Sequence, residues 1–111
     1  MDERTLKWLW DAQYSSKQIL LYVKQKNLAD FCENEFLQMA VERRFEILGE
    51  ALNRIRTKDE ESLITITDYD KVIGLRNLLA HEYDRLDPAI LFDVIQNKLP
   101  KLIREIDLLL E

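Results

Sequence analysis

The chain has 111 residues with a formal net charge of −5 at pH 7, and its two glycines and two prolines argue against an all-β fold and for one domain over residues 1–111. Hydrophobic residues make up 47% of the chain and charged residues 33%, which excludes disorder, and the longest apolar run, Ile19 to Val23, predicts a cytoplasmic protein without a membrane segment. A single cysteine, Cys32, excludes an internal disulfide, and with only one histidine we expect no metal and no cofactor.

Apolar residues recur with a helical period almost throughout, which predicts four main helices and one short helix. The first covers about Asp2 to Lys26, and the short helix follows from Leu28 to Glu33. The second long helix covers about Glu35 to Thr57, with Asn34 as its N-cap. Gly49 interrupts it, and since an interior glycine costs about 1 kcal/mol against alanine, we expect another helix to approach closely there.

From Lys58 to Thr67 the helical period fails and β-branched residues are frequent, which predicts a loop. Thr67 followed by Asp70 resembles a capping box that opens the third helix. This helix runs to about Glu82 or Tyr83.

The fourth helix has the clearest start, because Asp87 is an N-cap followed by a proline at the first helical position. Pro100 lies inside it and predicts a kink or a division there, since proline removes a backbone N–H. The apolar runs 19–23 and 108–110 cover more than the one face that a single core needs, which predicts burial against a second copy or ordinary exposed leucines at a frayed end.

Negative charge is concentrated in one segment. Residues 59–70 hold five acidic side chains and no basic one, so the other 99 residues are neutral overall. Local basic surfaces are therefore permitted around Arg43 and Arg44, around Arg54, and around Arg76. This distribution permits a nucleic-acid partner without pointing to one.

The only histidine, His81, stands near the predicted end of the third helix among polar residues with helical spacing. Asn77 shares its face, while Arg76 and Tyr83 share the adjacent one. An imidazole, an amide, a guanidinium and a phenol at one cleft suit the binding and reaction of a phosphodiester. The simpler alternative is that Arg76 pairs with an acid, His81 offsets the negative end of its helix, and Asn77 and Tyr83 have no chemical role.

The string Arg-Asn-x-x-Ala-His-x-Tyr resembles the active-site motif of HEPN-domain ribonucleases, specifically the HepT toxins. Residues 40–51 resemble the second-helix signature of that family, and residues 87–106 resemble its last helix. The resemblance implies an all-α, antiparallel HEPN bundle over nearly the whole chain, assembled as a twofold dimer. Two positions depart from the family pattern: Tyr69 stands in place of tryptophan, and Asp84 replaces an aromatic residue and adds a negative charge beside the motif.

The resemblance also implies a function, that of a toxin cleaving RNA without metal, with Arg76 and His81 as the catalytic residues. A ribose 2'-hydroxyl would attack the adjacent phosphorus, His81 would transfer protons, and Arg76 would stabilise the transition state. Asn77 would orient His81 or a phosphate oxygen. One step needs both an acid and a base, and a homodimer would supply the two histidines that one chain lacks.

A further implication of the resemblance concerns Tyr83, two residues after the histidine. HepT toxins are neutralised by a cognate minimal nucleotidyltransferase, MntA, that adenylylates this tyrosine. We therefore expect RNA and an MntA-like antitoxin as partners. The attached AMP would repel and exclude RNA by its charge and its volume.

Other interpretations stay open. The chain could be a catalytically inactive HEPN module that binds a nucleotidyltransferase or a nucleotide, or a dimerisation bundle without a ligand. Glu46 and Glu50 share a helix face and could act as acid and base, although with Arg43 one turn away a solvated ion-pair ladder is the simpler interpretation. Trp8 and Trp10 could stack on bases or pack against the protein.

Overall fold

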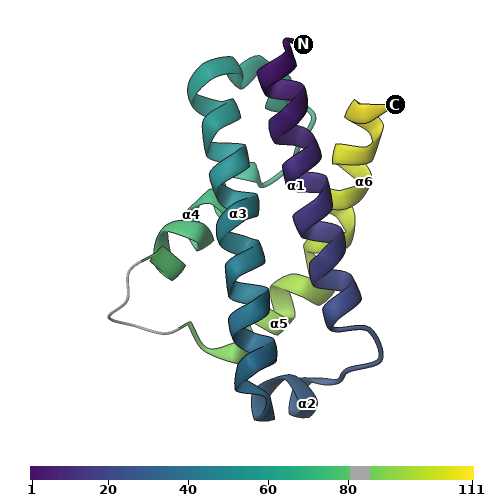
Figure 1. The fold of residues 1–111 in the computed structure, drawn as a ribbon, viewed down its shortest axis with the longest axis vertical. Coiled ribbons are helices and arrows are strands. Elements are labelled where there is room, and N and C mark those ends of the chain that lie inside the picture. Colours follow the sequence, from purple (N-terminus) through teal and green to yellow (C-terminus); the bar gives the residue numbers. More distant parts are fainter. Residues whose placement is uncertain (81–85) are drawn as a thin grey trace.

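The computed structural model describes residues 1–80 and 86–111, and within these ranges the regular elements are all helices (Figure 1). This confirms the predicted all-α fold. In chain order the elements are α1 (Glu3–Tyr22), α2 (Leu28–Glu33), α3 (Glu35–Asp59), the 3-10 helix η1 (Glu60–Leu63), α4 (Tyr69–Ala80), α5 (Pro88–Asn97) and α6 (Leu99–Leu110).

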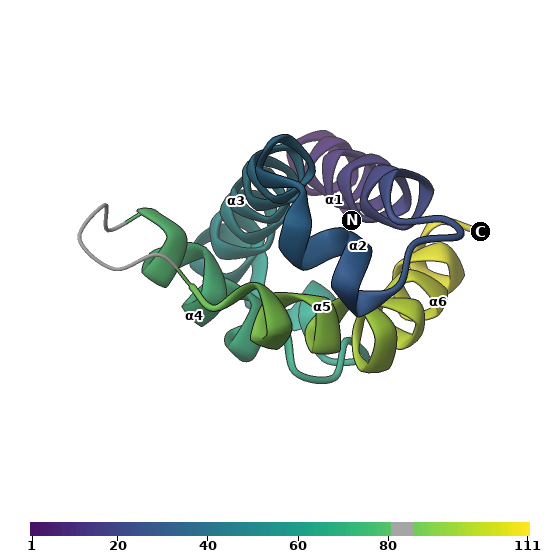
Figure 2. The ribbon, with the colours of Figure 1, turned by 90° about the horizontal axis from the view of Figure 1, so that it is seen from below.

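The helices pack in two layers around one core. The helices α1 and α3 run antiparallel and side by side, and α1 also packs against α6 while α3 packs against α4. Figure 2 shows α4, α5 and α6 on one side of the α1–α3 pair. This arrangement brings α4, which carries Arg76, against α3. The largest fully buried side chains come from both layers and from α2, η1 and the segment that follows η1: Leu9, Ile19, Phe31, Phe45, Leu48, Leu52, Ile55, Leu63, Ile66, Ile73, Leu91 and Ile95.

Two predicted helix starts are confirmed by the bonds of their capping residues. The side chain of Asn34 accepts a hydrogen bond from the backbone N–H of Leu37 at 3.0 Å, which caps α3. The side chain of Asp87 accepts from the backbone N–H of Ala89 at 2.9 Å, and Pro88 follows it as the first residue of α5. Both caps satisfy backbone donors that have no partner within the helix.

The first helix is shorter than predicted: it ends at Tyr22, whereas the prediction extended it to Lys26. Gln25 has a φ of 63°, which takes the chain out of the right-handed helix and into a turn. The next helix then starts with a capping box, in which Asn27 and Asp30 each bond the other's backbone N–H. A local turn and a strong cap therefore override the helical period at this point.

The segment 58–67, predicted as a loop, is partly helical, and the predicted capping box after it is wrong. The helix α3 continues into the segment, η1 follows, and Leu63 at the end of η1 is fully buried. The backbone N–H and the hydroxyl of Thr67 both donate to the carboxylate of Glu105 on α6, at 2.7 and 3.0 Å. A charged acceptor on another helix thus replaces the local cap, and α4 begins at Tyr69.

The predicted division at Pro100 is confirmed. The helix α5 ends at Asn97, Lys98 connects the two helices, and Pro100 lies in the first turn of α6. A proline is tolerated at this position because the first-turn N–H groups have no partner within the helix.

The two apolar runs pack mainly within the chain's own core. Ile19 and Val23 are buried, and Leu109 and Leu110 are half-buried against the core. Leu21 and Leu108 stay exposed. Among helices of the ranges 1–80 and 86–111, none combines the length and hydropathy that crossing a membrane requires.

Candidate functional site

A cleft of about 320 Å³ lies over α3, with walls from α1 and α4. It contains Arg76, the candidate catalytic residue whose side chain the structure describes. Charged side chains of both signs line it, together with an indole from α1. The lining residues are Trp8, Asp11, Arg43, Glu46, Ile47, Glu50, Ala51, Arg54 and Arg76.

The predicted close approach of another helix at Gly49 is confirmed, and the approaching helix is α4. A Cβ atom added at Gly49 would lie 2.2 Å from the Cβ of Arg76 and 3.3 Å from the backbone oxygen of Val72. Real Cβ atoms essentially never come within 3.0 Å of another heavy atom. Because Gly49 has no side chain, the Cβ of Arg76 can lie directly against the backbone of α3.

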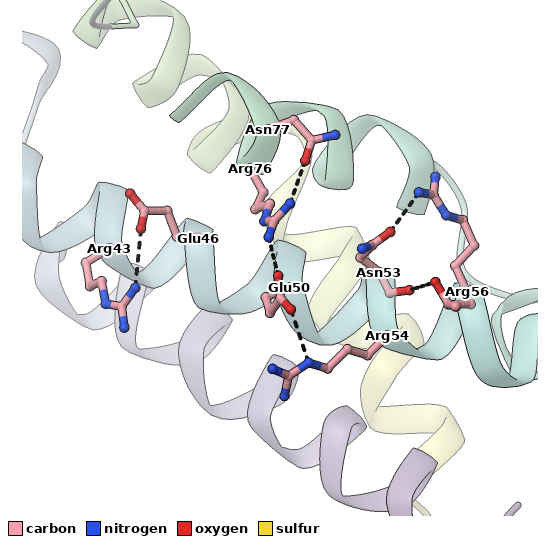
Figure 3. A network of polar contacts seen from close by, with 9 residues as sticks. Arg43, Glu46, Glu50, Asn53, Arg54, Arg56, Arg76 and Asn77 are labelled. Atoms are coloured by element: carbon pink, nitrogen blue, oxygen red, sulfur yellow. Dashed lines mark hydrogen bonds and ion pairs between the residues drawn. The ribbon is translucent and has the colours of Figure 1, made fainter. Parts of the chain in front are cut away.

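The guanidinium of Arg76 is held by two neighbours (Figure 3). Its Nη2 donates to Oε2 of Glu50 on α3 in a short ion pair, and its Nη1 donates to Oδ1 of Asn77 at 2.8 Å. The side chains of Arg76 and Glu50 are only 30% and 36% exposed. The simpler alternative predicted that Arg76 pairs with an acid. That pairing is confirmed, and the acid is Glu50.

The carboxylate of Glu50 also binds a second arginine. Its Oε1 accepts from Nε of Arg54 at 3.1 Å, one turn along α3 (Figure 3). Glu50 thus joins two arginines, while the lining of the cleft as a whole holds three arginines and three acidic residues and has no net formal charge. By contrast, Glu46 pairs with the exposed Arg43 at 3.3 Å on the same helix, as the ion-pair interpretation predicts.

The link from Glu50 to the motif was not predicted from the sequence. The spacing of four residues between Glu50 and Arg54 is the one local signal for half of this group, since such pairs meet on a helix surface. The other half depends on the packing of α4 against α3, which spacing along one helix does not reveal.

The described residues include only part of the predicted motif. His81, Tyr83 and Asp84 lie outside the described residues, as does the predicted end of the third helix. Asn77 is exposed, and its described contact is with Arg76. Over the residues that are described, no three histidine, cysteine or acidic side chains gather closely enough to hold a metal ion.

The predicted aromatic and basic residues divide between the cleft and other surfaces. Trp8 lines the cleft and packs against the core, whereas Trp10 is exposed. Arg44 lies outside the cleft lining: its Nε donates to the hydroxyl of Tyr22 at 3.1 Å, and its guanidinium lies 5.1 Å from the ring centre of Tyr14. Arg44 therefore belongs to an aromatic contact with α1.

Comparison with known proteins finds the same family across most of the chain. A family described as "Ribonuclease HepT-like" matches residues 13–109. "Putative RNase MJ1380" of Methanocaldococcus jannaschii is 28% identical over 109 residues, which are 97% of this chain and 99% of that protein. "Putative RNase MJ0125" of the same organism is 25% identical over 108 residues, covering 96% of this chain and 92% of the relative.

A longer protein of the same organism contains a similar region. "Gamma-glutamylcyclotransferase and putative RNase MJ0434" is 34% identical over 85 residues, which are 77% of this chain but only 38% of that protein. No solved structure gives a significant match.

Proposed function

Because the chain belongs to the HepT-like ribonuclease family, we propose that it is the toxin of a toxin–antitoxin pair and that it cleaves RNA without a metal ion. The observation that supports this proposal is the placement of Arg76. This motif residue lies in a cleft, and its guanidinium is oriented by Glu50 and Asn77. An oriented guanidinium is suited to the planar, bidentate binding of a phosphate.

The proposed reaction is a transesterification within the RNA. The ribose 2'-oxygen bonds to the adjacent phosphorus while the bond from phosphorus to the 5'-oxygen breaks. One group accepts the 2'-hydroxyl proton and another donates a proton to the leaving 5'-oxygen, and His81 is the residue suited to these transfers. Arg76 has five N–H donors, so it can bond Glu50 and Asn77 and still donate to the phosphate, where negative charge develops.

The experiment that tests this function is incubation of the protein with a tRNA mixture and a mixed-sequence RNA in EDTA. The protein is expressed without any antitoxin, and its mass is measured first to show that it has no attached AMP. We expect cleavage that leaves 2',3'-cyclic phosphate and 5'-hydroxyl ends. If the unmodified protein leaves every RNA intact, the ribonuclease proposal is wrong for this chain.

We also propose that the active form is a homodimer, because one histidine cannot serve as both acid and base in one step. An apolar groove of about 400 Å³ between α4 and α5 supports a binding surface for the second copy. Leu78 of α4 and Ile90 of α5 line it and are 57% and 53% exposed, and exposed apolar side chains that gather in one groove suit a contact with another surface. Pairing through α4 would bring the two motif helices together.

Replacing Leu78 by aspartate is expected to leave single, folded chains that no longer cleave RNA, since a charge in this groove opposes its burial. Sedimentation velocity measures the mass, and circular dichroism checks the helix content. Leu108→Asp is the matched control, because Leu108 is also an exposed leucine but lies on α6. A dimer that survives Leu78→Asp but dissociates with Leu108→Asp would move the interface to α6.

The proposed antitoxin is an MntA-like nucleotidyltransferase that modifies Tyr83. The phenol oxygen would attack the α-phosphorus of ATP, and pyrophosphate would leave, so that Tyr83 carries an AMP with its negative phosphate near the motif. Tyr83→Phe is expected to remain toxic and to gain no AMP mass when the transferase and ATP are present. Tyr69→Phe serves as the control and should be modified like the natural chain. Equal AMP incorporation into Tyr83→Phe would assign the modification to another residue.

A further inference from the structure

We infer that Glu50 is a positioning residue for RNA cleavage: its carboxylate holds the guanidinium of Arg76 in the cleft and joins it to Arg54. The inference rests on the proposed ribonuclease function and extends it to a residue outside the motif. Glu50 comes from α3 and Arg76 from α4, so the contact crosses between helices. Its role depends on three features of the site, which are the restraint of Arg76, the charge balance and the contrast with Glu46.

The first feature is that Arg76 is restrained at both ends of its side chain. Its Cβ lies against the backbone of α3 at Gly49, while Nη2 is bonded to Glu50 and Nη1 to Asn77. Bonds at both terminal nitrogens fix the plane of the guanidinium as well as its position. Asn77 is exposed and is the next residue on the same helix, so the contact with Glu50 is the one that ties the group to the rest of the bundle.

The second feature is the balance of charge. Glu50 is shared between Arg76 and Arg54, with Oε2 bound to the first and Oε1 to the second. Without this carboxylate, two guanidiniums at one cleft would repel each other, and the long Arg76 side chain would gain freedom. With it, the two positive groups stay together at the cleft.

The third feature is the difference between the two carboxylates of this helix face. Glu46 lines the same cleft one turn earlier, but its partner Arg43 is on the same helix and exposed. A pair of this kind contributes little to structure. Glu46 is therefore a matched control for Glu50, with the same side chain, the same cleft and a different partner.

The inference predicts opposite effects of Glu50→Gln on binding and on turnover. Removing a negative charge should leave KM for RNA unchanged or lower it, because the cleft becomes more positive. The rate constant kcat should fall by about 10- to 100-fold, because a displacement of about 1 Å in a positioning group can cost 10²-fold. A carboxylate that only repelled RNA would give the reverse, a gain in kcat/KM after its removal.

The experiment is a double-mutant cycle under single-turnover conditions with enzyme in excess. Wild type, Glu50→Gln, Arg76→Ala and the double variant are compared, with Glu46→Gln as the control. If Glu50 acts through Arg76, the Glu50 substitution costs nothing further once Arg76 is absent. Additive losses in the double variant, or an equal loss of kcat in Glu46→Gln, would overturn the inference.

A second measurement separates this inference from the ribonuclease proposal. Nitrogen NMR of the arginine side chains reports rotation of the Arg76 guanidinium, whose signals are assigned by their loss in Arg76→Lys. Slow rotation in the wild type and averaged signals in Glu50→Gln are expected. If wild type cleaves no RNA, the proposed function fails while this spectrum still shows whether Glu50 holds Arg76. Identical Arg76 signals in the two proteins would show that it does not.

Discussion

Replacing Arg76 by alanine is expected to reduce RNA cleavage by about 10³-fold or more, because arginines that stabilise a phosphoryl transition state contribute 10³- to 10⁵-fold. The chain should stay folded, since the side chain is partly exposed and its removal leaves α4 packed against α3. The measurement is the cleavage rate in EDTA, with thermal unfolding as the check on folding. His81→Ala should cause a loss of about 10²- to 10⁴-fold if the imidazole transfers protons.

Two further substitutions test the specificity of this result. Arg76→Lys keeps the charge but loses the planar fork, so its rate should lie between those of alanine and wild type. Arg54→Ala removes the other arginine bound to Glu50 and should lose at least about tenfold less activity than Arg76→Ala, because Arg54 is outside the motif. If Arg76→Ala cleaves RNA as fast as the wild type, the motif is not the active site.

Replacing Gly49 by alanine is expected to destabilise the fold and to impair cleavage together. By helix propensity alone the change would stabilise the chain by about 0.5–1 kcal/mol, since glycine is unfavourable inside a helix. The new methyl group, however, would lie 2.2 Å from the Cβ of Arg76 and 2.8 Å from its Cγ, so α4 must move away. Overpacking of this kind costs about 1–3 kcal/mol. The clash involves the base of a side chain, which cannot rotate away, and we expect a net loss of about 1–2 kcal/mol.

Gly74→Ala provides the matched control, because a Cβ at Gly74 would meet no atom within 4 Å. That variant should gain about 0.5–1 kcal/mol from helix propensity. Both free energies of unfolding are measured by urea titration in dilute protein, so that self-association does not contribute. A gain in stability for Gly49→Ala equal to that of Gly74→Ala would mean that α4 does not approach α3 in solution as closely as described.

Features that depend on residues close together in the sequence could be predicted. The helical period gave the fold class, and the start of α5 and its separation from α6 follow from Asp87 and Pro100. Local rules failed where a distant group competes with a local one. Thr67 has the sequence of a cap, but Glu105 is 38 residues away and offers a charged acceptor to both of its donors.

The candidate site shows the same limit. The motif residue Arg76 and the need for a close approach at Gly49 could be predicted from the sequence, but not that these two positions meet. The acid that pairs with Arg76 is 26 residues earlier in the chain, and no spacing rule within one helix connects them. Helix period predicts which residues share a face, whereas the pairing of faces depends on how the whole core packs.

The contact between Gly49 and Arg76 also limits how this sequence can change over time. A side chain gained at position 49 would displace Arg76. Once Arg76 is displaced, a second substitution that replaces it would cause little further loss of activity. If Arg76 acts as proposed, selection for cleavage would preserve both positions, although only Arg76 would contact the RNA. In related chains a glycine at the position of Gly49 should thus accompany the motif arginine, and a larger residue there should mark a lineage that has given up catalysis.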